Sequence, residues 1–150
     1  MGHTFYSVYE HIVFSTKNRV ACLNDNVQSE LFPYMAASIR NHSCSCLIVG
    51  GHREHVHTLV LKSSVLLTGD LVKEIKRTSS IWIEEKGWGL DFFGWQSGYG
   101  SFSVSYSNVE AVKQYIAMQR EHHMKMTWED EFKLLLEKNG VQFDPRYYLD

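Results

Sequence analysis

The spacing of apolar residues divides the chain into segments with strand-like or helix-like patterns. Helical segments carry apolar residues three or four positions apart, whereas strand-like segments are rich in β-branched and aromatic residues. The first six predicted elements are a strand over residues 4–15, a helix over 26–42, strands over 46–50 and 55–61, a helix over 67–86 and an aromatic strand over 92–105.

Capping residues mark where the predicted helices begin and end. A glycine commonly follows the last turn of a helix, and a serine or threonine three residues before an acidic residue commonly precedes the first. These signals are Gly87 after the second helix, Ser107 with Glu110 before a third, and Thr127 with Asp130 before a last helix over 128–138.

The order β-α-β-β-α-β is that of the split β-α-β, ferredoxin-like arrangement. We therefore expect an α+β fold in which an antiparallel sheet carries helices on one face and C-terminal helices follow. A chain of 150 residues has room for one core, so residues 1–150 should form a single domain.

Composition adds little to this picture beyond excluding some classes of protein. Hydrophobic residues make up 44% and charged residues 21%, an ordinary globular balance. No run approaches the ~20 apolar residues of a membrane span, and the first residues lack the layout of a signal peptide. We therefore expect a cytoplasmic protein without membrane contact. The net charge of −2 argues against nonspecific coating of nucleic acid but allows a local basic surface.

The three cysteines, Cys22, Cys44 and Cys46, are an odd number in a chain without export signals. This favours reduced thiols in a cytoplasm. Cys44 and Cys46 could bind a metal, but no second cysteine pair completes a four-ligand zinc site.

A pair of histidines is the sharpest local feature. His55 and His57 are two residues apart in a predicted strand, so their side chains point to the same sheet face with Cα atoms roughly 6.6 Å apart. Two such imidazoles can bind one cation. In a chain with eight histidines they can equally be ordinary surface or hydrogen-bonded residues. The spacing alone leaves both readings open.

Tyr115 and Gln119 form a second feature, because residues four positions apart share one face of a helix. Glutamine offers a neutral carbonyl oxygen that suits Mg²⁺ or Mn²⁺. Tyrosine offers a phenol that can attack phosphorus and form a covalent ester. The alternative is that Tyr115 is a core aromatic residue of an amphipathic helix.

Together these features resemble the HUH superfamily, most closely its small single-tyrosine transposases of the IS200 insertion-sequence type, with REP-associated tyrosine transposases as near relatives. One departure is Arg53-Glu54, where the family often has Pro-Asp. The matching blocks, in order, are HIVFSTKNR at 11–19, EHVH at 54–57, WQSGYGSFSVS at 95–105, YIAMQ at 115–119 and EHH at 121–123.

The resemblance implies a transposase that cuts and rejoins single-stranded DNA. Tyr115, carried by the C-terminal helices, would be the nucleophile and would form a 5′-phosphotyrosine linkage with release of a 3′-OH. His55, His57 and Gln119 would hold a divalent metal, Mg²⁺ or Mn²⁺. Two imidazoles and an amide oxygen are softer than carboxylates, so Mn²⁺ should bind at least as well as Mg²⁺. His122, seven residues after Tyr115, is a possible substitute ligand.

The resemblance also implies partners. The substrate would be single-stranded DNA hairpins at the ends of a mobile element, and the protein would be a homodimer whose active sites are completed in trans. The aromatic segment 92–105 is consistent with an edge strand that pairs across such a dimer, although it can equally lie within the monomer's own sheet.

Basic residues suggest where DNA phosphates bind. Three of them share one face of the second helix and two follow the first strand, and each could equally be an ordinary solvated charge. They are Lys73, Lys76 and Arg77 on the helix, and Lys17 and Arg19 after the strand.

Two other functions compete with this interpretation. The first is a non-catalytic or domesticated DNA-binding dimer, against which the intact set of Tyr115, His55, His57 and Gln119 counts. The second is a ferredoxin-like RNA-binding module, which would place stacking aromatics on the central strands where this chain has histidines. A DNA cleavage assay separates the transposase from both.

Overall fold

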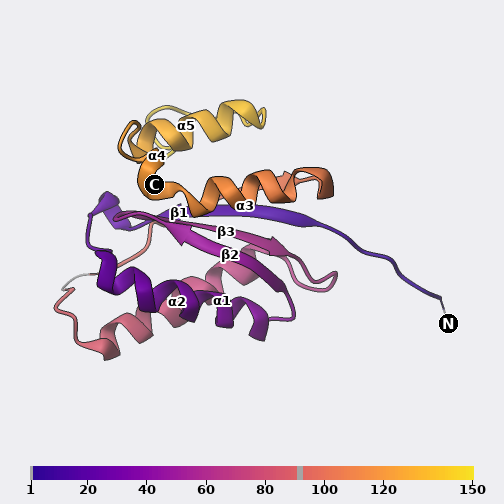
Figure 1. The fold of residues 1–150 in the computed structure, drawn as a ribbon, viewed down its shortest axis with the longest axis horizontal. Helices are drawn as coiled ribbons and strands as arrows, with labels where there is room; N and C mark the ends of the chain where they lie inside the picture. Colours follow the sequence, from indigo (N-terminus) through magenta and orange to yellow (C-terminus); the bar gives the residue numbers. More distant parts are fainter. Residues whose placement is uncertain (1, 91–92) are drawn as a thin grey trace.

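A four-stranded antiparallel sheet lies between two layers of helices in the computed structural model, which describes residues 2–90 and 93–150 (Figure 1). The strands, in the spatial order β2-β3-β1-β4, are β1 Tyr9–Ser15, β2 Ser45–Gly51, β3 His55–Leu61 and β4 Gly100–Val104. The helices are α1 Asp25–Asn41, α2 Thr68–Lys86, α3 Val109–Ala117, α4 Gln119–His122 and α5 Trp128–Lys138, with short 3-10 turns at Lys17–Arg19 and Tyr106–Asn108. The predicted α+β class and element order are confirmed.

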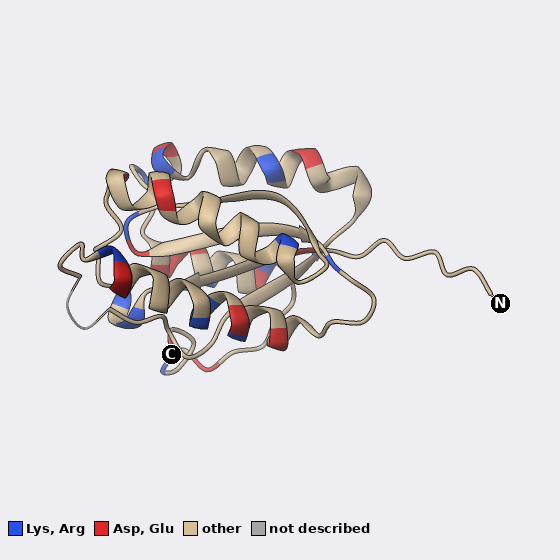
Figure 2. Ribbon diagram, turned by 90° about the horizontal axis from the view of Figure 1, so that it is seen from below, with Lys and Arg blue, Asp and Glu red and all other residues tan. Residues whose placement is uncertain are grey.

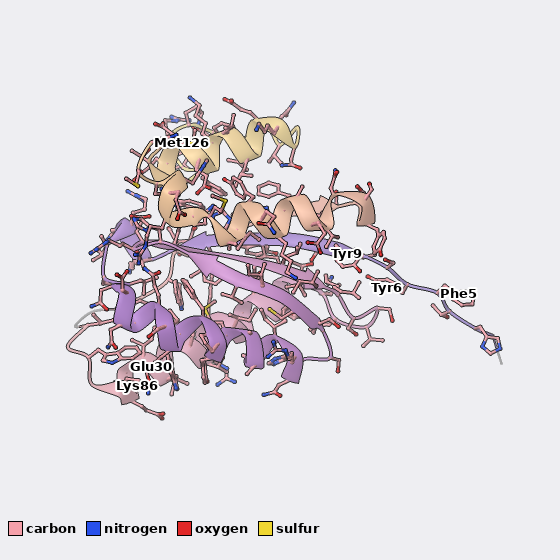
Figure 3. The ribbon with its side chains drawn as sticks, viewed as in Figure 1. Phe5, Tyr6, Tyr9, Glu30, Lys86 and Met126 are labelled. Atoms are coloured by element: carbon pink, nitrogen blue, oxygen red, sulfur yellow. The ribbon has the colours of Figure 1, made fainter. Side chains whose placement is uncertain are left out.

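The first strand begins at Tyr9 instead of residue 4. The neighbouring strands stop there, because Tyr9 faces Leu61 at the end of β3 and Val104 at the end of β4. The preceding residues extend away from the body (Figure 3), and the side chain of Phe5 is 94% exposed. A strand-like composition does not by itself form a strand where no neighbouring backbone pairs with it.

The aromatic segment predicted as a strand over 92–105 is also shorter. Phe92 lies outside the described residues, and β4 begins only at Gly100. Before Gly100 the chain bends so that Trp95 is buried, and its Nε1 donates a hydrogen bond of 2.9 Å to Ser79 of α2. Trp95 still pairs with Thr16 in an isolated antiparallel bridge, so the strand pattern is interrupted only between this bridge and β4.

One face of the sheet packs against α1 and α2 and forms the larger core. Val56 and Val60 of β3 are fully buried there with Leu31 of α1 and Ile75 of α2. Burial of side chains of this size contributes about 1.5–3 kcal/mol each. Gly87 adopts the left-handed conformation and ends α2, as predicted.

A surface ion pair also joins these two helices. Lys86 of α2 donates to Glu30 of α1 over 2.8 Å (Figure 3). None of the helices within residues 2–90 and 93–150 is both long and apolar enough to cross a membrane.

The opposite face of the sheet is covered by α3, α4 and α5 (Figure 1). Leu59 of β3 packs there against Val109 and Ile116 of α3. The backbone of α3 lies directly on β2, because a Cβ at Gly50 would come within 2.7 Å of the Ile116 carbonyl oxygen. The side chain next to Ile116, Tyr115, is therefore held at the surface of the sheet.

The two predicted capping pairs differ in outcome. Thr127 caps α5 by accepting the backbone N–H of Asp130, and α5 has the predicted bounds. The prediction that Ser107 and Glu110 form a capping box is wrong, since the N-cap of α3 is Asn108 and no side chain caps it. A 3-10 turn precedes that helix, and in it the Ser107 hydroxyl lies 3.2 Å from the Ser105 hydroxyl.

Candidate active site

Four side chains singled out in the sequence come together on the covered face of the sheet. His55 and His57 lie side by side on β3, Tyr115 comes from α3 and Gln119 from α4. His55 Nε2 lies 2.9 Å from Gln119 Oε1, and the His57 and Tyr115 rings are 5.8 Å apart. Residues from three separate elements thus share one buried cluster.

The spacing of Tyr115 and Gln119 predicted that both lie on one helix, but the helix is broken between them. Met118 interrupts the helical geometry with φ −104° and ψ 26°, which separates α3 from α4. The Met118 N–H closes α3 by donating to the Gln114 carbonyl at 3.2 Å, and the Gln119 side chain beyond it still reaches His55. Both side chains therefore still face the histidines.

Hydrogen bonds at Nδ1 orient both histidines. His55 Nδ1 donates to Glu54 Oε1 at 2.6 Å, and His57 Nδ1 lies 2.7 Å from His11 Nε2. A partner at one ring nitrogen sets the direction of the other, as in metal sites where a carboxylate holds a ligating histidine. The Nε2 atoms of both rings consequently point into the cluster. Glu54, which stands where the family often has aspartate, is thus the residue that orients His55.

Glu131 of α5 lies at the centre of the cluster, although the sequence patterns did not single it out. Its side chain is 1% exposed. Its Oε1 lies 3.4 Å from His55 Nε2, 3.3 Å from His57 Nε2 and 2.8 Å from His123 Nε2. Its Oε2 accepts from Gln119 Nε2 at 3.0 Å and from the Tyr115 hydroxyl.

One signal in the sequence could have revealed Glu131. On α5 the residue sits between Trp128 and Phe132, both buried, within the apolar stripe of the helix. An acidic residue at such a position is rarely buried unless it is paired. This position predicts a buried carboxylate, but the spacing does not predict which residues pair with it.

The pKa values of the histidines shift in different directions because their surroundings differ. Burial, joined by charge repulsion from neighbouring histidines, lowers the pKa of His57 to about 4 and that of His11 to about 3, so both are neutral at pH 7. Burial also lowers the pKa of His55, but hydrogen bonds to Glu131 and Glu54 outweigh it and raise that pKa overall. His55 faces an oxygen acceptor at each ring nitrogen, an arrangement that favours its protonated form.

The carboxyl of Glu131 and the phenol of Tyr115 are coupled. Burial would raise the pKa of Glu131, but hydrogen bonds from His123, His55 and His57 lower it far below the usual range, so the group is ionised. Burial and the charge of Glu131 together raise the pKa of Tyr115. The phenol is therefore protonated and donates its hydrogen to the carboxylate.

The donor atoms of this cluster fit a divalent cation. Two imidazole nitrogens, an amide oxygen and a carboxylate oxygen are all ligands of first-row and alkaline-earth ions. The ligand atoms of His55, His57 and Glu131 lie within 4.8 Å of one another, and those of Glu54, His55 and His123 form a second such group. His122, considered as a substitute ligand, lies 3.4 Å from the Tyr115 hydroxyl and 3.3 Å from Glu131 Oε2.

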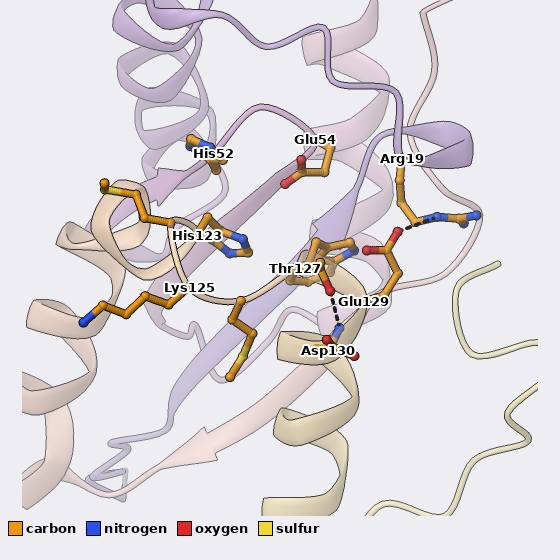
Figure 4. A pocket seen from close by; sticks show the side chains of 11 residues that line it. Arg19, His52, Glu54, His123, Lys125, Thr127, Glu129 and Asp130 are labelled. Atoms are coloured by element: carbon orange, nitrogen blue, oxygen red, sulfur yellow. Dashed lines mark hydrogen bonds and ion pairs between the residues drawn. The ribbon is translucent and has the colours of Figure 1, made fainter.

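Two cavities flank the cluster. One, of about 430 Å³, is lined by Tyr115, Glu131 and Asn108 among others, so a ligand in it would reach the phenol. The other, of about 600 Å³, is lined by His52 and His123, with Glu54 (Figure 4). The cluster is thus buried but accessible from two sides.

Two residues of the basic stripe predicted on the second helix have partners within the chain. Lys76 is half-buried and donates to the carbonyls of Gln96 and Gly98 at 2.8 and 2.7 Å, and burial lowers its pKa to about 8. Arg77 pairs with Glu74 at 2.7 Å. Figure 2 shows basic and acidic residues interspersed along the helices. The stripe also lies on α2, across the sheet from the histidines.

The remaining predicted DNA contacts are one residue of the stripe and two residues after β1. Lys73, the third residue of the stripe, is exposed on α2. Lys17 follows β1 and bonds through its N–H to the Gly94 carbonyl at 2.8 Å. Arg19 lines the larger cavity, where it pairs with Glu129 at 3.3 Å (Figure 4). Of the five residues, Arg19 is the one that lines a cavity beside the cluster.

Comparison with known proteins gives a consistent picture. The family model described as "Transposase IS200 like" matches residues 4–119. A crystal structure of a candidate transposase from Deinococcus radiodurans R1 is similar with a TM-score of 0.60 and 22% identity, over 79% of this chain and 96% of that one. A REP-associated tyrosine transposase bound to a REP hairpin gives a TM-score of 0.60 and 15% identity, over 82% of this chain and 72% of that one. No curated protein matches at a significant level.

Proposed function

The chain belongs to the IS200-like transposase family, and we propose that it cleaves and rejoins single-stranded DNA through a 5′-phosphotyrosine intermediate with Mg²⁺ or Mn²⁺. The observation that carries the proposal is the convergence of the Tyr115 hydroxyl with the donor atoms of His55, His57 and Gln119 in one buried cluster. A nucleophile beside a cation site is the arrangement that phosphoryl transfer requires.

Each residue has a defined role in this proposal. His55, His57 and Gln119 would hold the ion, which would polarise a non-bridging phosphate oxygen when bound. The Tyr115 oxygen would attack phosphorus in line, and its proton has an acceptor in Glu131 Oε2. The bond from phosphorus to the 3′ oxygen would break, and that oxygen would leave as a 3′-OH after taking a proton from solvent.

Covalent storage of the phosphoester suits strand exchange. Attack of a different 3′-OH on the phosphotyrosine would reform a DNA backbone and release Tyr115 without ATP. The cavity of about 430 Å³ beside Tyr115 supports access of a strand to this position.

We propose hairpins of single-stranded DNA as the substrate. The similar REP-associated tyrosine transposase is bound to a REP hairpin, and a hairpin presents unpaired nucleotides next to a duplex stem. The exposed aromatic Tyr106, in the turn before α3, is suited to stack on an unpaired base.

We also propose that residues 1–150 form one domain in the cytoplasm. All three hydrophobic clusters include buried residues of the same sheet, which supports a single folding unit. Cys22, Cys44 and Cys46 are free thiols, which suits a reducing compartment.

A homodimer is proposed as the active assembly. Strand β4 is an edge of the sheet, paired only with β1 among the described strands, so it can pair with a second copy. In one chain Tyr115 already lies beside its own His57, and exchange of α3–α5 between two chains would build the same cluster in trans. Light scattering should give about twice the monomer mass at micromolar concentration. An active monomer would refute the dimer.

A cleavage and adduct assay tests the function itself. Single-stranded oligonucleotides that tile the DNA flanking the gene would be incubated with the protein and Mn²⁺, then run on a denaturing gel. We expect a cut strand and a denaturant-resistant protein–DNA adduct for the hairpin-containing oligonucleotides, and neither when EDTA is added. Tight binding without cleavage on every oligonucleotide would instead favour a non-catalytic or domesticated DNA-binding dimer.

A further inference from the structure

We propose that Glu131 is a fourth protein ligand of this metal site, supplied by the C-terminal helix α5. The inference rests on the proposed function, because it adds a ligand to the site that His55, His57 and Gln119 would form. Glu131 Oε1 would bind the ion, and Oε2 would keep its hydrogen bond to the Tyr115 hydroxyl. One carboxylate would then join the ion to the nucleophile.

The division of contacts between the two oxygens supports this role. Oε1 faces the nitrogens of His55 and His57 at 3.4 and 3.3 Å, whereas Oε2 faces the Tyr115 hydroxyl and the Gln119 amide nitrogen. The ligand atoms of His55, His57 and Glu131 lie within 4.8 Å of one another, close enough to share one ion. A small shift of the rings around a bound ion would suffice, without movement of the backbone.

Packing holds α5 in place for this contact. The Trp128 ring stacks on the His55 ring with centroids 4.3 Å apart and planes at 13°. Phe132, next to Glu131, packs so close to β4 that a Cβ at Gly100 would lie 2.8 Å from its ring. The carboxylate is thus positioned by two buried aromatic neighbours on a capped helix.

Glu131 is a feature of this chain beyond the part that the family model describes. The family match ends at residue 119, whereas Glu131 lies on α5, twelve residues later. Its contacts with the histidines and Tyr115 are therefore what indicates its role.

The charge of the site favours a ligand over a purely structural carboxylate. Imidazoles bind a metal in their neutral form, so His55, His57 and the Gln119 amide would bring no negative charge to the ion, and Mg²⁺ is usually bound through one or two carboxylates. A buried carboxylate is costly unless a positive charge or hydrogen bonds compensate it. With Glu131 included, Mg²⁺ fits this site better than His55, His57 and Gln119 alone suggested.

Calorimetric titration of the full-length protein with Mn²⁺ tests the proposal. Glu131→Gln keeps the size of the side chain but removes its charge and one of its two accepting oxygens. We expect it to weaken Mn²⁺ binding by more than about 100-fold, beyond the 10- to 100-fold loss typical of residues that only orient the ligands. Glu137→Gln makes the same change at an exposed position of the same helix and should leave the affinity unchanged.

The outcomes separate this inference from the proposed function. If Glu131→Gln binds Mn²⁺ as tightly as wild type while His57→Ala does not bind it, Glu131 is not a ligand and the metal site stands. If wild-type protein binds no Mn²⁺, the proposed metal site fails and the inference fails with it.

A measurement on wild-type protein covers the case in which Glu131→Gln does not fold. The side-chain carboxyl carbons of ¹³C-labelled glutamates are followed by NMR as Mg²⁺ is added. The Glu131 signal should shift while the Glu137 signal stays in place. A Glu131 signal that does not move while the His57 ring signals do would overturn the proposal.

Discussion

Tyr115→Phe should abolish strand cleavage and the covalent protein–DNA adduct, lowering the cleavage rate by at least about four orders of magnitude. The change removes one oxygen, and that oxygen is the proposed nucleophile. The phenol also donates to Glu131, so the variant loses one hydrogen bond to a charged group, which costs about 1–3 kcal/mol of stability. Metal and hairpin binding should persist, because His55, His57 and Gln119 are unchanged.

The measurement is a denaturing gel after incubation with a hairpin-containing oligonucleotide and Mn²⁺. Tyr147→Phe is a matched control, since Tyr147 lies in the C-terminal segment and is 59% exposed. It should keep the adduct. An adduct band of wild-type strength in Tyr115→Phe would show that another residue is the nucleophile, and the proposed mechanism would then be wrong.

Replacement of His55 and His57 together by alanine should remove Mn²⁺ binding and with it DNA cleavage. The two rings supply the Nε2 atoms that face Gln119 and Glu131. Alanine has no side-chain atom that could replace them as metal ligands. Bound ion stabilises the wild-type fold by about 2.7 kcal/mol at a concentration 100 times its dissociation constant. The variant should lose this metal-dependent rise in melting temperature.

Calorimetry and thermal unfolding with and without Mn²⁺ measure the loss. The double variant also leaves a cavity where two buried rings were, so its melting temperature without metal should fall as well. The decisive quantity is therefore the difference that Mn²⁺ makes within each protein. His3→Ala, on the exposed N-terminal segment, should behave as wild type. Equal Mn²⁺ affinity in the double variant and the wild type would exclude these histidines as ligands.

Local rules determined much of the architecture and the pairing of residues within each element. Alternation along a strand places His55 and His57 on one face whatever surrounds them. Apolar spacing located both long helices, and α5 has the bounds predicted from Thr127 onward. Such rules depend only on backbone geometry, which is why they could be read from the chain without its fold.

Pairing with distant segments set the limits of the strands. The strand expected from residue 4 starts at Tyr9, where β3 and β4 run out, and the aromatic segment bends to bury Trp95 before β4 begins at Gly100. Likewise, the side chain of Lys76 turns to the Gln96 and Gly98 carbonyls, a contact that helical spacing does not reveal.

The sequence by itself determined the family, the order of elements and the candidate side chains Tyr115, His55, His57 and Gln119. Only the tertiary structure decided what those side chains face. Where α5 docks depends on packing between segments far apart in the chain, since the Trp128 ring must reach the His55 ring. That docking carries Glu131, an acidic residue without a recognisable motif, into contact with the histidines and the phenol. Its partners follow from three-dimensional proximity and from the need to compensate a buried charge, and neither is encoded in residue spacing.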